Sequence, residues 1–140
     1  MKNPTDLEQE RETRILFIAG NPTFRPVVIR FLKRYDELNL VGIVSEKVLA
    51  QAQELRPQVI LLDLDTSDRT GLETISDLRA LLPEAGIVGL SLLDAEGYRQ
   101  AVLAAGANDL VLKSNLRTDL LPAIRRAAQD GRPGPERSCP

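Results

Sequence analysis

The sequence predicts an α/β fold in which a five-stranded parallel sheet lies between two layers of helices. Short apolar runs, typical of buried strands, alternate five times with stretches in which apolar residues recur at helical spacing. The connections between these stretches are short. The sequence contains no internal repeat and no second domain. Because crossovers between parallel strands are right-handed, we expect the strand order 2-1-3-4-5.

The expected strands are apolar runs that end at glycine, proline or polar residues. They cover residues 15–19, 40–44, 59–63, 86–91 and 110–112. Each is followed by a stretch with one apolar face, which predicts a helix. These helices cover residues 24–35, 48–55, 72–82, 98–105 and 116–128.

Residues that favour helix ends mark several of the expected boundaries. Ser45 and Thr118 are predicted to cap the second and fifth helices through their hydroxyl groups. With Thr118 as the cap, Pro122 falls in the first turn, where a missing backbone donor costs little. Pro83 ends the third helix, and Gly106 suits the left-handed conformation that often closes a helix.

The two ends of the chain have the composition of flexible segments. Residues 1–13 are polar without apolar periodicity, and residues 130–140 are rich in glycine and proline. We therefore expect one folded domain over residues 14–129, flanked by a flexible extension and a flexible tail.

Composition excludes several classes of function. The chain contains no histidine, which excludes histidine-based triads, histidine zinc sites and phosphohistidine carriers within it. Its single cysteine, Cys139, allows no internal disulfide. A formal net charge of -2 gives no broad basic surface for nucleic acid. No apolar run is long enough to cross a bilayer, so we expect a cytoplasmic protein that binds neither membrane nor nucleic acid directly.

Polar residues stand where the expected strands end. The apolar run that begins at Val59 stops at Asp63, the fourth strand stops at Ser91, and the fifth stops before Lys113. Because parallel strands end at one edge of a sheet, these side chains are expected to meet there. A carboxylate can attack a phosphoryl group, a lysine can neutralise phosphoryl oxygens, and a hydroxyl can donate to one of them. Singly each residue has an ordinary structural explanation, but together they favour phosphoryl chemistry.

Five short motifs carry a family resemblance. They are Ile15-Leu16-Phe17-Ile18 ahead of Asn21-Pro22, Leu61-Leu62-Asp63 ahead of Gly71-Leu72, Val88-Gly89-Leu90-Ser91, Ala104-Ala105-Gly106-Ala107 and Val111-Leu112-Lys113. With them the chain resembles the receiver domains of bacterial two-component response regulators, especially those that precede a helix-turn-helix DNA-binding domain. The resemblance implies a flavodoxin-like (βα)5 fold. It also implies that Asp63 is the phosphoacceptor, Ser91 the hydroxyl switch residue and Lys113 the phosphate-binding lysine.

The chain departs from that pattern at the metal site. Where the family carries an acidic pair that holds Mg²⁺, this sequence has Ala19 and Gly20. Asp63 and Lys113 then balance each other's charge, so we expect no cofactor, or only weak Mg²⁺ binding. The loop carboxylates that could compensate are Asp65 and Asp68. Further departures are Leu110, where an aromatic residue is frequent, and Ser67 and Thr70 in the loop after the third strand.

The sequence therefore predicts an atypical receiver-like signalling module, not an enzyme, that acts through protein contacts with weak or no Mg²⁺-dependent phosphorylation. The expected partner is a histidine kinase or another signalling protein, bound through the face of the fourth helix, fifth strand and fifth helix. A homodimer is a further expected assembly. The face of the fourth helix, fifth strand and fifth helix is expected to carry Tyr98, Arg99, Leu110, Arg117, Arg125 and Arg126.

Three other interpretations stay open at this point. In the first, Asp63 is a working phosphoacceptor whose Mg²⁺ is held through Asp65 or Asp68. In the second, the chain is a receiver cut from a longer DNA-binding regulator. In the third, it is a flavodoxin-like cofactor binder in which Gly20-Asn21-Pro22-Thr23 cradles a phosphate at a helix start.

Overall fold

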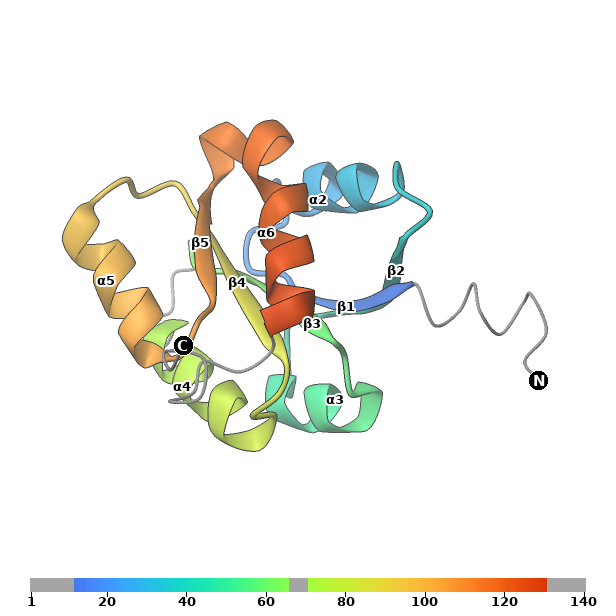
Figure 1. The fold of residues 1–140 in the computed structure, drawn as a ribbon, viewed down its shortest axis with the longest axis horizontal. Helices are drawn as coiled ribbons and strands as arrows, with labels where there is room; N and C mark the ends of the chain where they lie inside the picture. The colour runs from blue at the N-terminus through green and yellow to red at the C-terminus, as the bar shows by residue number, and fades with distance from the viewer. Residues whose placement is uncertain (1–11, 66–70, 131–140) are drawn as a thin grey trace.

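The computed structural model describes residues 12–65 and 71–130, and these form one parallel sheet with helices on both faces (Figure 1). The strand order is β2-β1-β3-β4-β5, so the predicted topology is confirmed. The strands are β1 Thr13–Ile18, β2 Leu38–Val44, β3 Val59–Asp63, β4 Gly86–Ser91 and β5 Asp109–Leu112. The helices are α2 Arg25–Leu32, α3 Val48–Leu55, α4 Gly71–Leu81, α5 Glu96–Ala105 and α6 Leu116–Asp130, with a 3-10 turn at Lys113–Asn115.

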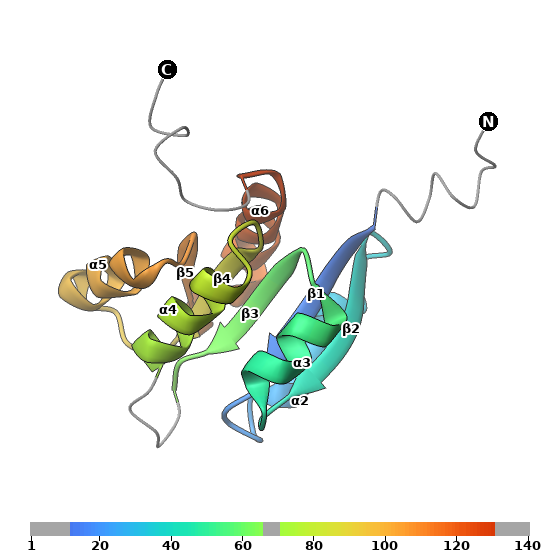
Figure 2. The same ribbon diagram turned by 90° about the horizontal axis from the view of Figure 1, so that it is seen from below.

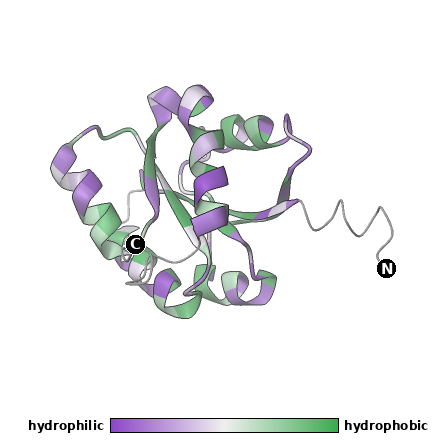
Figure 3. Cartoon of the chain, in the orientation of Figure 1, coloured by the Kyte–Doolittle hydropathy of each residue, from purple (hydrophilic) through white to green (hydrophobic). Residues whose placement is uncertain are grey.

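The sheet separates two apolar cores. Helices α2 and α6 cover one face, while α3, α4 and α5 cover the other (Figures 1 and 2). Successive strand residues point to opposite faces, so Phe17 packs in the α2/α6 core while Leu16 and Ile18 pack in the other. All five residues of β3 are buried, because this central strand is covered on both faces. Figure 3 shows apolar strands at the centre of the molecule and polar residues on the outer surfaces of the helices.

Two predicted helix caps are wrong. Helix α3 begins after Lys47, which is in the left-handed conformation (φ 51°), and no side-chain hydrogen bond caps it, so Ser45 is not the cap. Helix α6 continues from the 3-10 turn and starts at Leu116, which leaves Thr118 and Pro122 inside it. The Thr118 hydroxyl donates instead to the carbonyl of Asn115 at 3.2 Å. The predicted C-cap at Gly106 agrees with the structure, where its φ is 125°.

The predicted end segments lie almost wholly outside the described residues. Two residues of the predicted end segments belong to regular elements, since β1 begins at Thr13 and α6 ends at Asp130. Among the residues that the structure describes, no helix combines the length and the apolar character that a membrane span requires.

Candidate functional site

The carboxyl ends of the central strands bring the three predicted site residues together. Asp63 is the last residue of β3, Ser91 is the last of β4, and Lys113 directly follows β5. The parallel pairing of β3, β4 and β5 places these ends side by side. All three residues are buried, although each carries a polar or charged side chain. Buried polar groups of this kind need partners within the protein.

Asp63 and Lys113 form a buried ion pair. The Lys113 Nζ lies 2.8 Å from Asp63 Oδ1, and both side chains are almost completely shielded from solvent. The amide of Asp65 donates to the same oxygen at 2.9 Å, and the amide of Asn21 donates to Asp63 Oδ2 at 3.1 Å. Each oxygen of the Asp63 carboxylate therefore accepts at least one hydrogen bond from the protein.

Asp65 is drawn into the site as a second carboxylate. Its Oδ2 lies 2.9 Å from Lys113 Nζ and accepts the amide of Leu92 at 2.7 Å. Its Oδ1 accepts the hydroxyl of Ser91 at 3.3 Å, and that hydroxyl in turn accepts the amide of Leu93 at 2.9 Å. The expected one-to-one balance between Asp63 and Lys113 is thus replaced by two carboxylates that share one ammonium group. Asp68, the other carboxylate considered from the sequence, lies outside the described residues.

An aromatic ring completes the surroundings of Lys113. The ammonium group lies 4.3 Å from the centroid of the Phe24 ring, at a distance where a cation–π attraction operates. Phe24 immediately precedes α2, and the helical spacing of its neighbours had indicated a core residue only. No local sequence signal links it to Lys113, because the contact joins the start of α2 to the end of β5.

The described residues do not fit a resident Mg²⁺ ion. Ala19 and Gly20, which directly follow β1, offer no side-chain oxygen. Both oxygens of Asp63 and both of Asp65 already accept protein hydrogen bonds. No group of three metal-binding side chains occurs in residues 12–65 and 71–130. A hard cation that needs carboxylate anchors would have to displace several of these contacts.

Tyr98, in the first turn of α5, has a phenol whose pKa depends on its burial and on the charge of Asp65. Burial, and after it the negative charge of Asp65, raise the pKa of the Tyr98 phenol above its ordinary value. Burial and the Asp65 charge both oppose ionisation of the phenol, so folding stability is unaffected below the pKa of the unfolded chain and falls as the pH rises through the folded pKa. We expect Asp65→Asn to lower the pKa of Tyr98, but not to its ordinary value, because burial remains. Titration of tyrosinate absorbance measures this, with Asp94→Asn as the charge-matched control; an unchanged pKa in Asp65→Asn would contradict it.

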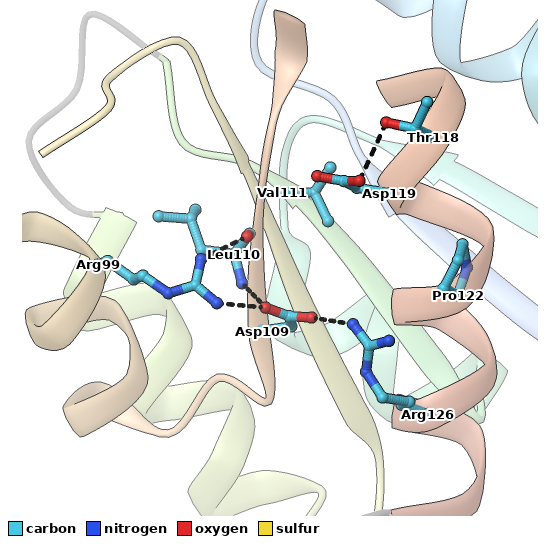
Figure 4. Close-up of a pocket in the computed structure, with 8 residues that line it drawn as sticks. All are labelled: Arg99, Asp109, Leu110, Val111, Thr118, Asp119, Pro122 and Arg126. Atoms are coloured by element: carbon cyan, nitrogen blue, oxygen red, sulfur yellow. Dashed lines mark hydrogen bonds and ion pairs between the residues drawn. The ribbon is translucent and has the colours of Figure 1, made fainter. Parts of the chain in front are cut away.

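The surface formed by α5, β5 and α6 is organised by Asp109 (Figure 4). Its two carboxylate oxygens bind Arg99 of α5 at 3.0 Å and Arg126 of α6 at 2.8 Å. Arg99 also donates to the carbonyl of Leu110 at 2.9 Å. Two of the residues expected here differ from the prediction. Leu110 is buried, and Arg125 turns away to pair with Glu37, which precedes β2.

A match to a family model identifies the family of the chain. The model of the response regulator receiver domain matches residues 15–125, which is most of the chain. The chain belongs to this family. The receiver domain identified here contains Asp63, Ser91 and Lys113 within the matched range.

Individual relatives agree with this assignment. The response regulator protein VraR of Staphylococcus aureus is 28% identical over 120 residues, which cover 83% of this chain and 56% of VraR. The chain thus spans little more than half the length of the curated relatives it matches. A LuxR-family two-component response regulator from Aurantimonas sp. SI85-9A1 has the same fold, with a TM-score of 0.79, 21% identity and coverage of 91% and 93% of the two chains. The response regulator domain of Thermotoga maritima CheB gives a TM-score of 0.76 at 23% identity, covering 85% of this chain and 98% of that one.

Proposed function

We propose that this receiver domain is an atypical signalling module that works through protein contacts, with weak or no Mg²⁺-dependent phosphorylation of Asp63. The observation that carries the proposal is the closed network around Asp63, in which Lys113 and two backbone amides occupy its oxygens. Phosphoryl transfer depends on positioning and on neutralising the charge that develops. With Ala19 and Gly20 in place of the metal-binding pair, the site lacks the groups that normally recruit the neutralising ion.

The partner surface in this proposal is the face of α5, β5 and α6. Receiver domains interact with histidine kinases, and this face presents Arg99 and Arg126 in fixed positions because Asp109 binds both. A signalling protein with a complementary acidic surface would meet these guanidinium groups. We include a homodimer through the same face in the proposal.

A working phosphoacceptor is the second candidate function. It is favoured by the presence of Asp63, Ser91 and Lys113 together at one sheet edge. In that case the domain would belong to a DNA-binding regulator, as the names of LuxR-family structural neighbours indicate for those proteins. The cofactor-binding alternative has less support, because the Asn21 amide donates to Asp63 and the Thr23 amide donates to the Asn21 side chain at 2.8 Å. Neither amide is therefore available to cradle a phosphate.

A phosphodonor assay separates the first two candidates. The protein is incubated with acetyl phosphate and Mg²⁺ and then weighed intact, beside a variant that restores the acidic pair, Ala19→Asp/Gly20→Asp. We expect no mass change in the natural protein and the gain of one phosphoryl group in the restored variant. Adding Asp63→Asn to the restored variant should abolish the gain, because it removes the accepting carboxylate.

The outcome that overturns the proposal is equally direct. A phosphoryl gain in the natural protein, located at Asp63 by peptide mapping and absent without Mg²⁺, would establish a working phosphoacceptor. If the double variant does not fold, Gly20→Asp alone serves, since Gly20 does not have the positive φ that favours glycine.

A further inference from the structure

We propose that the Asp65 carboxylate is an internal ligand that fills an anion site formed by the Lys113 ammonium, the Leu92 amide and the Ser91 hydroxyl. The domain would then be held in an anion-bound arrangement without any phosphodonor, and loss of the carboxylate would open the site to a small tetrahedral oxyanion such as inorganic phosphate. The proposed anion site stands on its own contacts. Only its consequence, a partner surface held in one state, rests on the proposed function.

Three donors from two strand ends converge on this one carboxylate. The Leu92 amide and the Lys113 ammonium reach Oδ2 at 2.7 and 2.9 Å, and the Ser91 hydroxyl reaches Oδ1 at 3.3 Å. One ammonium, one backbone amide and one hydroxyl are the donor types that bind oxyanions in proteins. Because charged partners shorten and strengthen such bonds, the set forms a charge-assisted anion site.

The backbone delivers Asp65 to this site. The β3–β4 pairing continues one residue past Asp63, since the Leu64 amide donates to the carbonyl of Leu90 at 2.9 Å. The Asp65 amide then donates to Asp63 at 2.9 Å. With the backbone held by these two hydrogen bonds, the carboxylate is presented at a high effective concentration, against which a free anion competes poorly.

The members of the cluster differ in burial. The side chain of Lys113 is 2% exposed and Ser91 is fully buried, whereas the side chain of Asp65 is 22% exposed. The two side-chain donors are therefore more deeply buried than the Asp65 carboxylate that binds them. Truncating this side chain would take the acceptor away from the Leu92 amide and the Ser91 hydroxyl, while Lys113 would keep only its pairing with Asp63.

The two side-chain donors, Ser91 and Lys113, are also the residues expected from the sequence to bind phosphoryl oxygens. Ser91 and Lys113 are already bound to Asp65, so a phosphoryl group on Asp63 would have to displace a tethered carboxylate to reach them. Occupation by Asp65 thus supplies the negative charge that a phosphoryl group would otherwise bring. The arrangement would keep the partner surface in one state whatever the level of phosphodonor.

The test follows the Leu92 amide by ¹H–¹⁵N NMR in the natural chain, in Asp65→Ala and in Asp94→Asn. Asp94 is exposed and lies on the same loop as Leu92, between β4 and α5. Its substitution removes one negative charge close to the Leu92 amide and is the matched control. Amide hydrogen exchange is measured first, followed by a titration with inorganic phosphate against chloride at equal ionic strength. Asp65→Asn, which keeps the side-chain volume, is the second variant if Asp65→Ala does not fold.

We expect the Leu92 amide to exchange about tenfold faster in Asp65→Ala than in the natural chain and in Asp94→Asn, because a charge-assisted hydrogen bond is lost. Phosphate should shift its signal saturably in Asp65→Ala, and should leave it unmoved in the natural chain. Equal exchange in all three proteins, or the same phosphate response with and without the Asp65 carboxylate, would overturn the inference. A natural chain that gains a phosphoryl group from acetyl phosphate yet keeps a protected Leu92 amide would refute the proposed function alone.

Discussion

Replacing Lys113 with methionine is expected to lower the free energy of unfolding by about 3–5 kcal/mol at neutral pH, since it leaves the buried carboxylate of Asp63 without its cation. The ammonium group lies 2.8 Å from Asp63 Oδ1 and 2.9 Å from Asp65 Oδ2. Each of these two oxygens also accepts a hydrogen bond from a backbone amide. Methionine fills a similar volume, so the loss reports the charge rather than a cavity. The cation–π contact with Phe24 is lost in the same substitution. Urea unfolding at equilibrium measures the effect.

Two further variants test whether the loss of stability in Lys113→Met comes from the buried charge. Lys33→Met makes the same chemical change at an exposed position just after α2 and should alter stability little. Adding Asp63→Asn to Lys113→Met removes the buried charge and should recover a substantial part of the loss. A double variant no more stable than Lys113→Met would show that the ammonium contributes through packing and not through its pairing with Asp63.

Replacing Gly86 with alanine is expected to destabilise the domain by about 2–3 kcal/mol, because the new methyl group meets the backbone of α6. A Cβ at Gly86 would lie 2.6 Å from the carbonyl oxygen of Ala127 and 2.7 Å from its Cβ. A helix backbone cannot yield as the end of a flexible side chain can, so α6 must move away from β4. Thermal or urea unfolding measures the loss.

Gly97 supplies the matched control for this substitution. It lies in the first turn of α5, and a Cβ built there meets no atom within 4 Å. Gly97→Ala should therefore stabilise the domain by about 0.5–1 kcal/mol through helix propensity. If the two alanine variants change stability in the same direction, close packing of α6 on β4 is not what requires glycine at position 86.

The strands could be predicted because each is a compact apolar run between clear breaks. The expected strands at 59–63 and 86–91 and the expected helix at 48–55 coincide with β3, β4 and α3. Burial on both faces gives such central strands an uninterrupted apolar sequence, which is a strong local signal. The strand order then followed from handedness, and the placement of Asp63, Ser91 and Lys113 at one edge followed from the order.

What could not be predicted depends on contacts between distant segments. Asp65 turns inward because Leu92 and Lys113, far along the chain, supply donors for its carboxylate. The sequence allowed this orientation without favouring it. The cap at Thr118 failed for a related reason, since α6 continues from the 3-10 turn after β5 and starts at Leu116, ahead of the residue that the local hydroxyl signal indicates.

The guanidinium of Arg99 affects how the sheet can associate with other chains. β5 is an edge strand in the described part of the chain, and edge strands offer unpaired backbone groups to which a foreign strand can add. Arg99 already occupies the Leu110 carbonyl, and the adjoining Asp109 side chain fastens arginines from the helices on either side. An incoming strand would have to break these contacts. Addition of a foreign strand at β5 therefore carries the cost of these contacts, which protects this edge of the sheet against continuous growth.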